Sequence, residues 1–175
     1  MSDRIAIFID GSNFYHGLKR NIEINEIDFS KFGKKLVGDR MLIRTYYYNA
    51  PLDWSFDKKK YQKQQEFFEK LRKISNFKLI LVRLQKRVIN GKPIYFVKGD
   101  DIHLATDLIV LAYKNAYDTA ILVSGDGDFV PAIKAVQEIG KRVENYYFKI
   151  SGSWHLRQIC DKSVLMNKKF VLNVQ

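Results

Sequence analysis

"VSGDGDFVPAIKAVQEIGKRV" (residues 123–143) places two aspartates, Asp126 and Asp128, between an apolar run and a helix-like pattern. The stretch 118–124, which contains the apolar run 120–123, predicts a buried strand, and the spacing of apolar residues over 129–140 predicts a helix. One aspartate at the end of a strand is ordinary turn chemistry. Two of them, in a chain whose formal net charge is +11, indicate that a cation binds there.

Predicted strands and helices alternate along the rest of the chain. Further strands are predicted at 4–9, 40–50, 77–88, 93–98 and 141–148. Further helices are predicted at 12–20, 28–38, 57–75, 100–116 and 153–161. Several strands are apolar throughout, which is typical of a mostly parallel sheet with both faces covered. The sequence therefore predicts a three-layer α/β fold, with a hairpin turn at Asn90-Gly91.

The length of 175 residues suits one domain with a substantial core. We expect residues 1–150 to form this domain and 151–175 to form a C-terminal extension packed on it. The single cysteine, Cys160, excludes an internal disulfide and a cysteine-based zinc cluster, and it fits a reducing cytoplasm. No signal peptide and no apolar segment of membrane-spanning length are recognisable, so a cytoplasmic location without membrane contact is expected.

Positive charge predominates, with 30 Lys and Arg residues against 19 Asp and Glu residues. The resulting pI is about 9.6. Such a balance favours a polyanionic partner, and nucleic acid is the most common one.

Aspartates follow the ends of several predicted elements. Asp10 follows the strand at 4–9, Asp101 starts the helix that follows the strand at 93–98, and Asp107 lies further along that helix. In parallel sheets, ligands bind outside the carboxyl ends of the strands, so we expect these groups and the 126/128 pair to meet at one edge. Carboxylates held that close repel one another unless a cation neutralises them.

Oxygen ligands without a cysteine or histidine cluster select a hard ion, Mg²⁺ or Mn²⁺. Such an ion can activate water and stabilise the leaving oxygen when a phosphate ester is displaced. An acidic metal site on a basic protein is the combination expected of a phosphodiester hydrolase.

Each aspartate also has a simpler interpretation. Asp10 can be a turn residue, and Asp101 or Asp128 can cap a helix. Asp107 is harder to explain, because it lies in the apolar stretch "HLATDLIVL". Asp100 and Asp107 differ by about 20° around the helix, whereas Asp101 and Asp107 differ by about 120°. Which of Asp100 and Asp101 reaches the site is therefore open.

Three blocks of the sequence carry a family resemblance. "IAIFIDGSNFYHGL" (5–18), "KGDDIHLATDL" (98–108) and "YDTAILVSGDGDFVPAIKAVQEIGKRV" (117–143) resemble, in the same order, the NYN domains of the LabA-like branch of PIN-like nucleases. The resemblance runs from residue 4 to about residue 148. It implies a Rossmann-like PIN fold and metal-dependent cleavage of RNA at a cluster of aspartates.

The resemblance also implies roles for individual residues. The metal ligands would be Asp10, Asp101, Asp126 and Asp128, and Asp107 would join them as a catalytic acid. Three further residues, Asn13, Ser124 and Lys98, would position water or phosphate. The implied cofactor is Mg²⁺ or Mn²⁺, and the implied partner is single-stranded RNA. PIN-like relatives often pair, so a homodimer is an open option.

Two other functions compete with the nuclease. The first is a catalytically weak PIN-like module that binds RNA or protein and uses the same acids for a structural ion. The second is a metal-dependent phosphatase or nucleotide hydrolase, which the sequence disfavours. Dehalogenase-type phosphatases need Asp-x-Asp after the first strand, where this chain has Asp10-Gly11-Ser12, and no phosphate-binding G-x-x-x-x-G-K-[ST] loop is present.

Overall fold

The structure is a computed structural model, and it describes every residue except 1, 24–25, 56, 90–91 and 173–175. Within residues 84–98, it describes the backbone of the strands and, of the side chains, only that of Val88.

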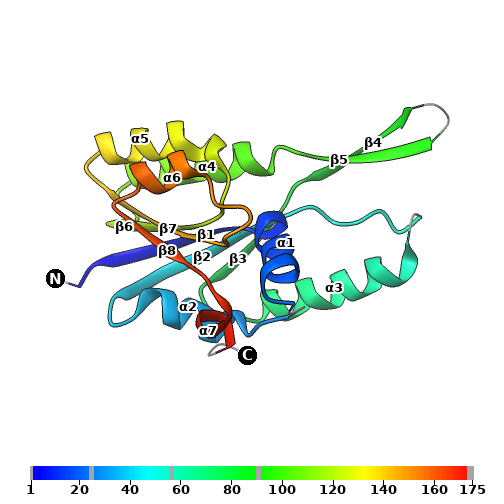
Figure 1. Ribbon diagram of the computed structural model, residues 1–175, viewed down its shortest axis with the longest axis horizontal. Coiled ribbons are helices and arrows are strands. Elements are labelled where there is room, and N and C mark those ends of the chain that lie inside the picture. The colour runs from blue at the N-terminus through cyan, green and yellow to red at the C-terminus, as the bar shows by residue number, and fades with distance from the viewer. Residues whose placement is uncertain (1, 24–25, 56, 90–91, 173–175) are drawn as a thin grey trace.

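A six-stranded parallel sheet forms the centre of the molecule (Figure 1). In chain order its strands are β1 (Arg4–Asp10), β2 (Met41–Asn49), β3 (Phe77–Leu81), β6 (Thr119–Val123), β7 (Arg142–Tyr147) and β8 (Lys162–Leu165). Their spatial order is β3-β2-β1-β6-β7-β8, and every neighbouring pair is parallel. This is the doubly wound order, in which the direction of the chain across the sheet reverses between β1 and β6.

Helices cover both faces of the sheet. They are α1 (Gly11–Asn21), α2 (Phe29–Val37), α3 (Lys58–Arg72), α4 (Asp100–Tyr113), the short helix η1 (Gly127–Phe129), α5 (Val130–Glu138), α6 (Trp154–Ile159) and α7 (Lys168–Leu172). Figure 1 shows α4, α5 and α6 on one face and α1, α2, α3 and α7 on the other. The predicted three-layer α/β fold with a mostly parallel sheet is therefore confirmed.

Alternation along β1 divides the core in two, because successive side chains of a strand point to opposite faces. Ile5, Ile7 and Ile9 pack with the apolar side of α1, α2 and α3. Ala6 and Phe8 pack with the apolar side of α4, α5 and α6. Burial on both sides explains why this strand is apolar throughout.

The predicted strand at 77–88 is wrong in its extent. The structure ends β3 at Leu81, and a new strand β4 (Arg83–Ile89) pairs antiparallel with β5 (Lys92–Lys98). These residues pair locally instead of extending the edge of the main sheet, and the hairpin projects from the body (Figure 1). The strand predicted at 93–98 is therefore not part of the central sheet, and the predicted Asn90-Gly91 turn lies outside the described residues.

The C-terminal segment adds two elements that the sequence pattern does not indicate. The short strand β8 pairs with β7 and becomes the last strand of the central sheet. Helix α7 follows it and packs Val171 into the core on the side of α1 and α2. A four-residue strand with Lys162 and Ser163 among its residues has too little apolar pattern to be predicted.

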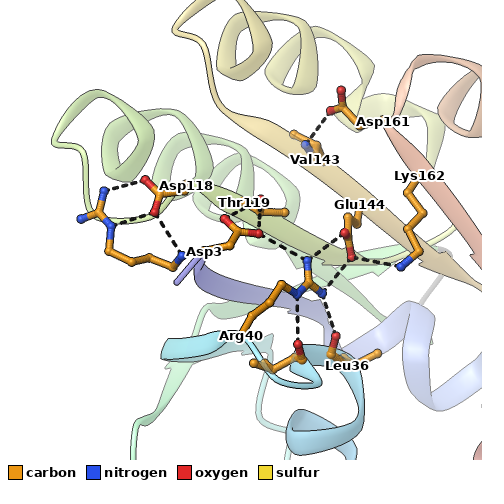
Figure 2. A network of polar contacts seen from close by, with 11 residues as sticks. Asp3, Leu36, Arg40, Asp118, Thr119, Val143, Glu144, Asp161 and Lys162 are labelled. Carbon is orange, nitrogen blue, oxygen red and sulfur yellow. Dashed lines mark hydrogen bonds and ion pairs between the residues drawn. The ribbon is translucent and has the colours of Figure 1, made fainter. Parts of the chain in front are cut away.

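Ion pairs hold the amino-terminal edge of the sheet together (Figure 2). The Arg40 guanidinium donates to both carboxylate oxygens of Glu144 on β7, at 2.8 and 3.1 Å, and also to the carbonyl oxygens of Leu36 and Val37. Arg4 pairs with Asp118 in the same way at the start of β6. Within the part of the chain that is described, no helix has both the length and the apolar character needed to cross a membrane.

Candidate functional site

A cavity of about 370 Å³ lies at the carboxyl ends of β1 and β6, where the strand order reverses. Doubly wound sheets bind their ligands at this position. Four carboxylates line it: Asp10, Asp100, Asp101 and Asp126. Asp10 and Asp126, which are 116 residues apart in the sequence, thus share one cavity.

Asp10 is the last residue of β1 and the N-cap of α1. Its carboxylate accepts hydrogen bonds from the Asn13 amide at 3.0 Å and from the Ser124 hydroxyl at 3.0 Å. Burial raises the pKa of Asp10 to about 6, against the opposing effect of these two hydrogen bonds, and the charges of Asp100 and Asp126 raise it further. The protein therefore holds this carboxylate in place but gives it an environment that disfavours its charge.

The loop after β6 is fastened to Asp10 through Ser124. Ser124 is only 2% exposed, and its hydroxyl accepts a hydrogen bond from the Asp126 backbone amide at 3.1 Å while it donates to Asp10. Asp126 in turn caps η1 by accepting from the Asp128 amide at 2.9 Å. Ser124 thus joins the carboxylate of Asp10 to the backbone of Asp126.

Gly125 allows the segment that follows β7 to pack onto the same loop. A Cβ atom at this position would lie 2.0 Å from the carbonyl oxygen of Ser151, so only glycine fits. The Gly125 amide donates to the Asn13 side-chain oxygen at 3.1 Å, and the Ser151 hydroxyl donates to the same oxygen at 3.4 Å. Asn13 therefore joins α1, the loop after β6 and the segment around Ser151.

Both candidate acids of α4 reach the cavity. Asp100 and Asp101 form its first turn, where negative charge is favourable because of the helix dipole. Gly99 begins the helix with a left-handed φ of 91°, which turns the chain out of β5 and points the helix at the cavity. Burial raises the pKa of Asp101 to about 6, and the charges of Asp100, Asp10, Asp126 and Asp128 add to the effect.

Two of the predicted residues, Asp107 and Asp128, are described but are not among the residues that line the cavity. Asp107 accepts a hydrogen bond from the Tyr48 hydroxyl at 2.9 Å, and Tyr48 is the register partner of Asp10 on β2. Burial, first of all, and the charge of Asp107 raise the pKa of Tyr48 well above its usual range. Asp128 is exposed on η1. The side chain of Lys98 lies outside the described residues, so its predicted role stays a prediction.

Sequence reasoning missed several residues of the lining. His16, Gly17, Arg20 and Asn21 of α1 face the cavity together with Asn13. They follow Asn13 by three, four, seven and eight residues, and this helical spacing is the signal that could have found them. Ile150 and Ser151 also line it, and nothing in the local sequence pattern indicates their proximity.

Among the residues that the structure describes, no three His, Cys, Asp or Glu side chains already converge closely enough to hold one metal ion. The four carboxylates border one cavity without forming a ready coordination shell.

Comparisons with known proteins agree with this architecture. The NYN domain model matches residues 4–167, which is past the expected limit near 148 and includes β8. A crystal structure of a protein of unknown function from Vibrio parahaemolyticus has a TM-score of 0.77 and 27% identity, covering 97% of this chain and 96% of that chain. An uncharacterised protein of Methanocaldococcus jannaschii is 28% identical over 174 residues, and the chain spans 58% of the length of that relative. Because the NYN model matches nearly the whole sequence and the fold is of the PIN-like type, the chain belongs to the NYN domain family.

Proposed function

We propose that this protein is a metal-dependent ribonuclease that hydrolyses RNA phosphodiester bonds at the aspartate-lined cavity. The observation that carries the proposal is the meeting of four carboxylates from β1, the loop after β6 and α4 at the switch point of the sheet. Family membership supports a nuclease in general, because NYN domains are generally ribonucleases.

The donor set fits Mg²⁺ or Mn²⁺. These ions favour oxygen ligands, and Mg²⁺ commonly keeps several waters while only one or two carboxylates bind it. Carboxylates that border a cavity without converging on one point suit such partly hydrated binding. Asp10 and Asp126 would hold the ion, with Asp101 or Asp100 as the contribution of α4. When bound, such an ion lowers the pKa of a coordinated water and offsets charge on the phosphate.

The chain's own residues would orient the reaction. Ser124 holds Asp10 in place, and Asn13 fixes the loop that carries Asp126. The side-chain nitrogen of Asn13, Nδ2, has no hydrogen bond to a described group, unlike the backbone amide, so it can donate to a water or a phosphate oxygen. Asp107 would act indirectly, by accepting the hydrogen bond of Tyr48, which is the register partner of Asp10 on β2.

RNA as the partner is supported by the distribution of charge. Residues 83–98 of the β4–β5 hairpin contain no Asp or Glu but carry Arg83, Lys86, Arg87, Lys92 and Lys98. The hairpin continues through Gly99 directly into the acidic start of α4. A cationic arm joined to an anionic cavity can hold the backbone of a nucleic acid while one phosphate enters.

The test is cleavage of labelled single-stranded RNA in Mg²⁺, in Mn²⁺ and in excess EDTA. We expect cleavage that depends on metal, and its loss in Asp10→Asn and in Asp126→Asn. Asp39→Asn is the matched control, because Asp39 is an exposed aspartate outside the cavity lining. Cleavage that persists equally in both cavity variants contradicts the proposal.

A second candidate function is an RNA-binding module with little turnover. The observation that favours it is the lack, within the described part of the chain, of three acids already gathered around one point. Retention of RNA by the native protein without cleavage in either metal would select this function.

A further inference from the structure

Helix α1 forms a second wall of the cavity, opposite in character to the acidic one. Asn13, His16, Gly17 and Arg20 lie three or four residues apart and therefore share one face of the helix. The seven-residue step from Asn13 to Arg20 corresponds to a rise of about 10 Å. The wall thus runs from a carboxylate-rich end beside Asp10 to a cationic end at Arg20.

The guanidinium of Arg20 is not used by the fold. It is exposed to solvent, and it makes no hydrogen bond or ion pair within the described chain. Arg40 and Arg4, by contrast, each donate to a carboxylate and to backbone carbonyls. Arg20 therefore keeps its five donors for a ligand, and a planar guanidinium is well suited to a phosphate.

The segment around Ile150 forms part of the cavity at the Arg20 end of α1. The Ile150 amide donates to the Asn21 side-chain oxygen at 3.1 Å, and the Asn21 amide nitrogen donates to the Gly17 carbonyl at 2.8 Å. These bonds hold the segment against α1. Ile150 is left 64% exposed and lines the same cavity, where it offers an apolar surface next to the Arg20 end of α1.

We propose that Arg20, with His16 beside it on α1, binds the phosphate adjacent to the one placed at the carboxylates, while the ribose or base next to that phosphate lies on Ile150. This inference rests on the proposed function, and it names the substrate class as a single-stranded RNA that continues beyond the scissile bond. A single phosphate group would not reach both ends of the wall.

Binding of labelled single-stranded RNA, measured by fluorescence anisotropy in the Asp126→Asn background, tests the subsite without requiring cleavage. We expect Arg20→Gln to weaken binding about tenfold or more, since a hydrogen-bonded charge is lost. Lys19→Gln removes the same charge from the neighbouring position of α1, which does not line the cavity, and should change binding less than threefold. The dependence of affinity on salt should also fall by about 0.7 in logarithmic slope for Arg20→Gln.

Neutral linkages identify the phosphate. RNA oligonucleotides that each carry one methylphosphonate, at successive positions, are titrated against Asp126→Asn with and without Arg20→Gln. At one position adjacent to the cleaved bond, the effect of Arg20→Gln should disappear, because the contact is already lost. Equal effects of Arg20→Gln and Lys19→Gln, or an Arg20→Gln effect that persists with every neutral linkage, would overturn the subsite.

The two proposals fail separately. If the native protein cleaves no RNA but Arg20→Gln binds RNA more weakly than Lys19→Gln, the subsite stands and the nuclease does not. If the native protein cleaves RNA and the two variants bind alike, the nuclease stands and the subsite does not.

Discussion

Replacing Asp10 by asparagine should stabilise the metal-free protein at neutral and alkaline pH. Asp10 is 6% exposed, and its burial raises the pKa of the carboxyl group to about 6 in the folded state. The folded state then binds more protons than the unfolded state between about pH 4 and pH 6, so stability falls as the pH rises through this window and stays low above it. Asparagine has no proton to lose there.

The magnitude follows from the two pKa values. A carboxyl group that ionises near 4 when unfolded and near 6 when folded costs about 3 kcal/mol at pH 8, and about 1 kcal/mol at pH 4.5. The oxygen of the introduced asparagine can still accept from the Asn13 amide, but Ser124 loses its acceptor, which costs about 1 kcal/mol. The net gain is about 2 kcal/mol at pH 8, or about 4–8 °C in melting temperature, and about zero at pH 4.5.

Urea denaturation in EDTA, at pH 4.5 and at pH 8, measures this difference. Asp39→Asn, which removes an exposed aspartate, should change stability by less than about 0.5 kcal/mol at both values. The reasoning is refuted if Asp10→Asn is less stable than the native protein at pH 8, or if its effect is the same at the two pH values.

Three further results are expected. Excess MgCl₂ should raise the melting temperature of the native protein more than that of Asp126→Asn, because ligand binding to the folded state alone adds stability, and equal shifts would speak against binding at the cavity. Gly125→Ala should cost about 1–3 kcal/mol in urea denaturation, since its Cβ would overlap the Ser151 carbonyl, whereas Gly33→Ala, with nothing nearer than 3.8 Å, should be neutral or slightly stabilising. Arg40→Met should cost about 2–3 kcal/mol by the same measurement because Glu144 is buried, and a loss below about 0.5 kcal/mol would contradict its role in Figure 2.

Except for β8, the strands of the central sheet were predictable because their signals are local. The strands at 4–9 and 118–124 contain the continuous apolar runs 5–9 and 120–123, and each is followed by a predicted helix, which is typical of parallel order. The β4–β5 hairpin was not predictable. The run over 77–88 has no turn residue at Val82, where the chain leaves the central sheet. Only the choice of partner separates β3 from β4, and a choice of partner is not a local property.

The candidate site also has residues that were predictable and residues that were not. Asp10 and Asp126 were predictable because each directly follows a strand whose position in the sheet can be inferred. Ser124 was predicted to meet substrate, but its hydroxyl is buried between Asp10 and the Asp126 amide, which only the closing of the loop determines. The contact of Ile150 and Ser151 with α1 depends on a loop that returns over the site after β7. No sequence pattern at residues 150 and 151 predicts this contact.

The two ends of the sheet show why the acidic cavity calls for a function. At the amino-terminal edge, carboxylates have cationic partners: Asp118 meets Arg4, which holds the pKa of Asp118 well below its usual range, and Glu144 meets Arg40 (Figure 2).

At the carboxyl-terminal edge, the four carboxylates of the cavity form no ion pair with any described residue, and the pKa values of Asp10 and Asp101 are raised. A chain with 30 Lys and Arg residues has cations enough to neutralise both edges. Carboxylates that lack an ion pair and are partly buried at one edge cost stability when they are charged, although Asp10 and Asp126 also cap helices, so a ligand of opposite charge is the simplest reason for the whole group.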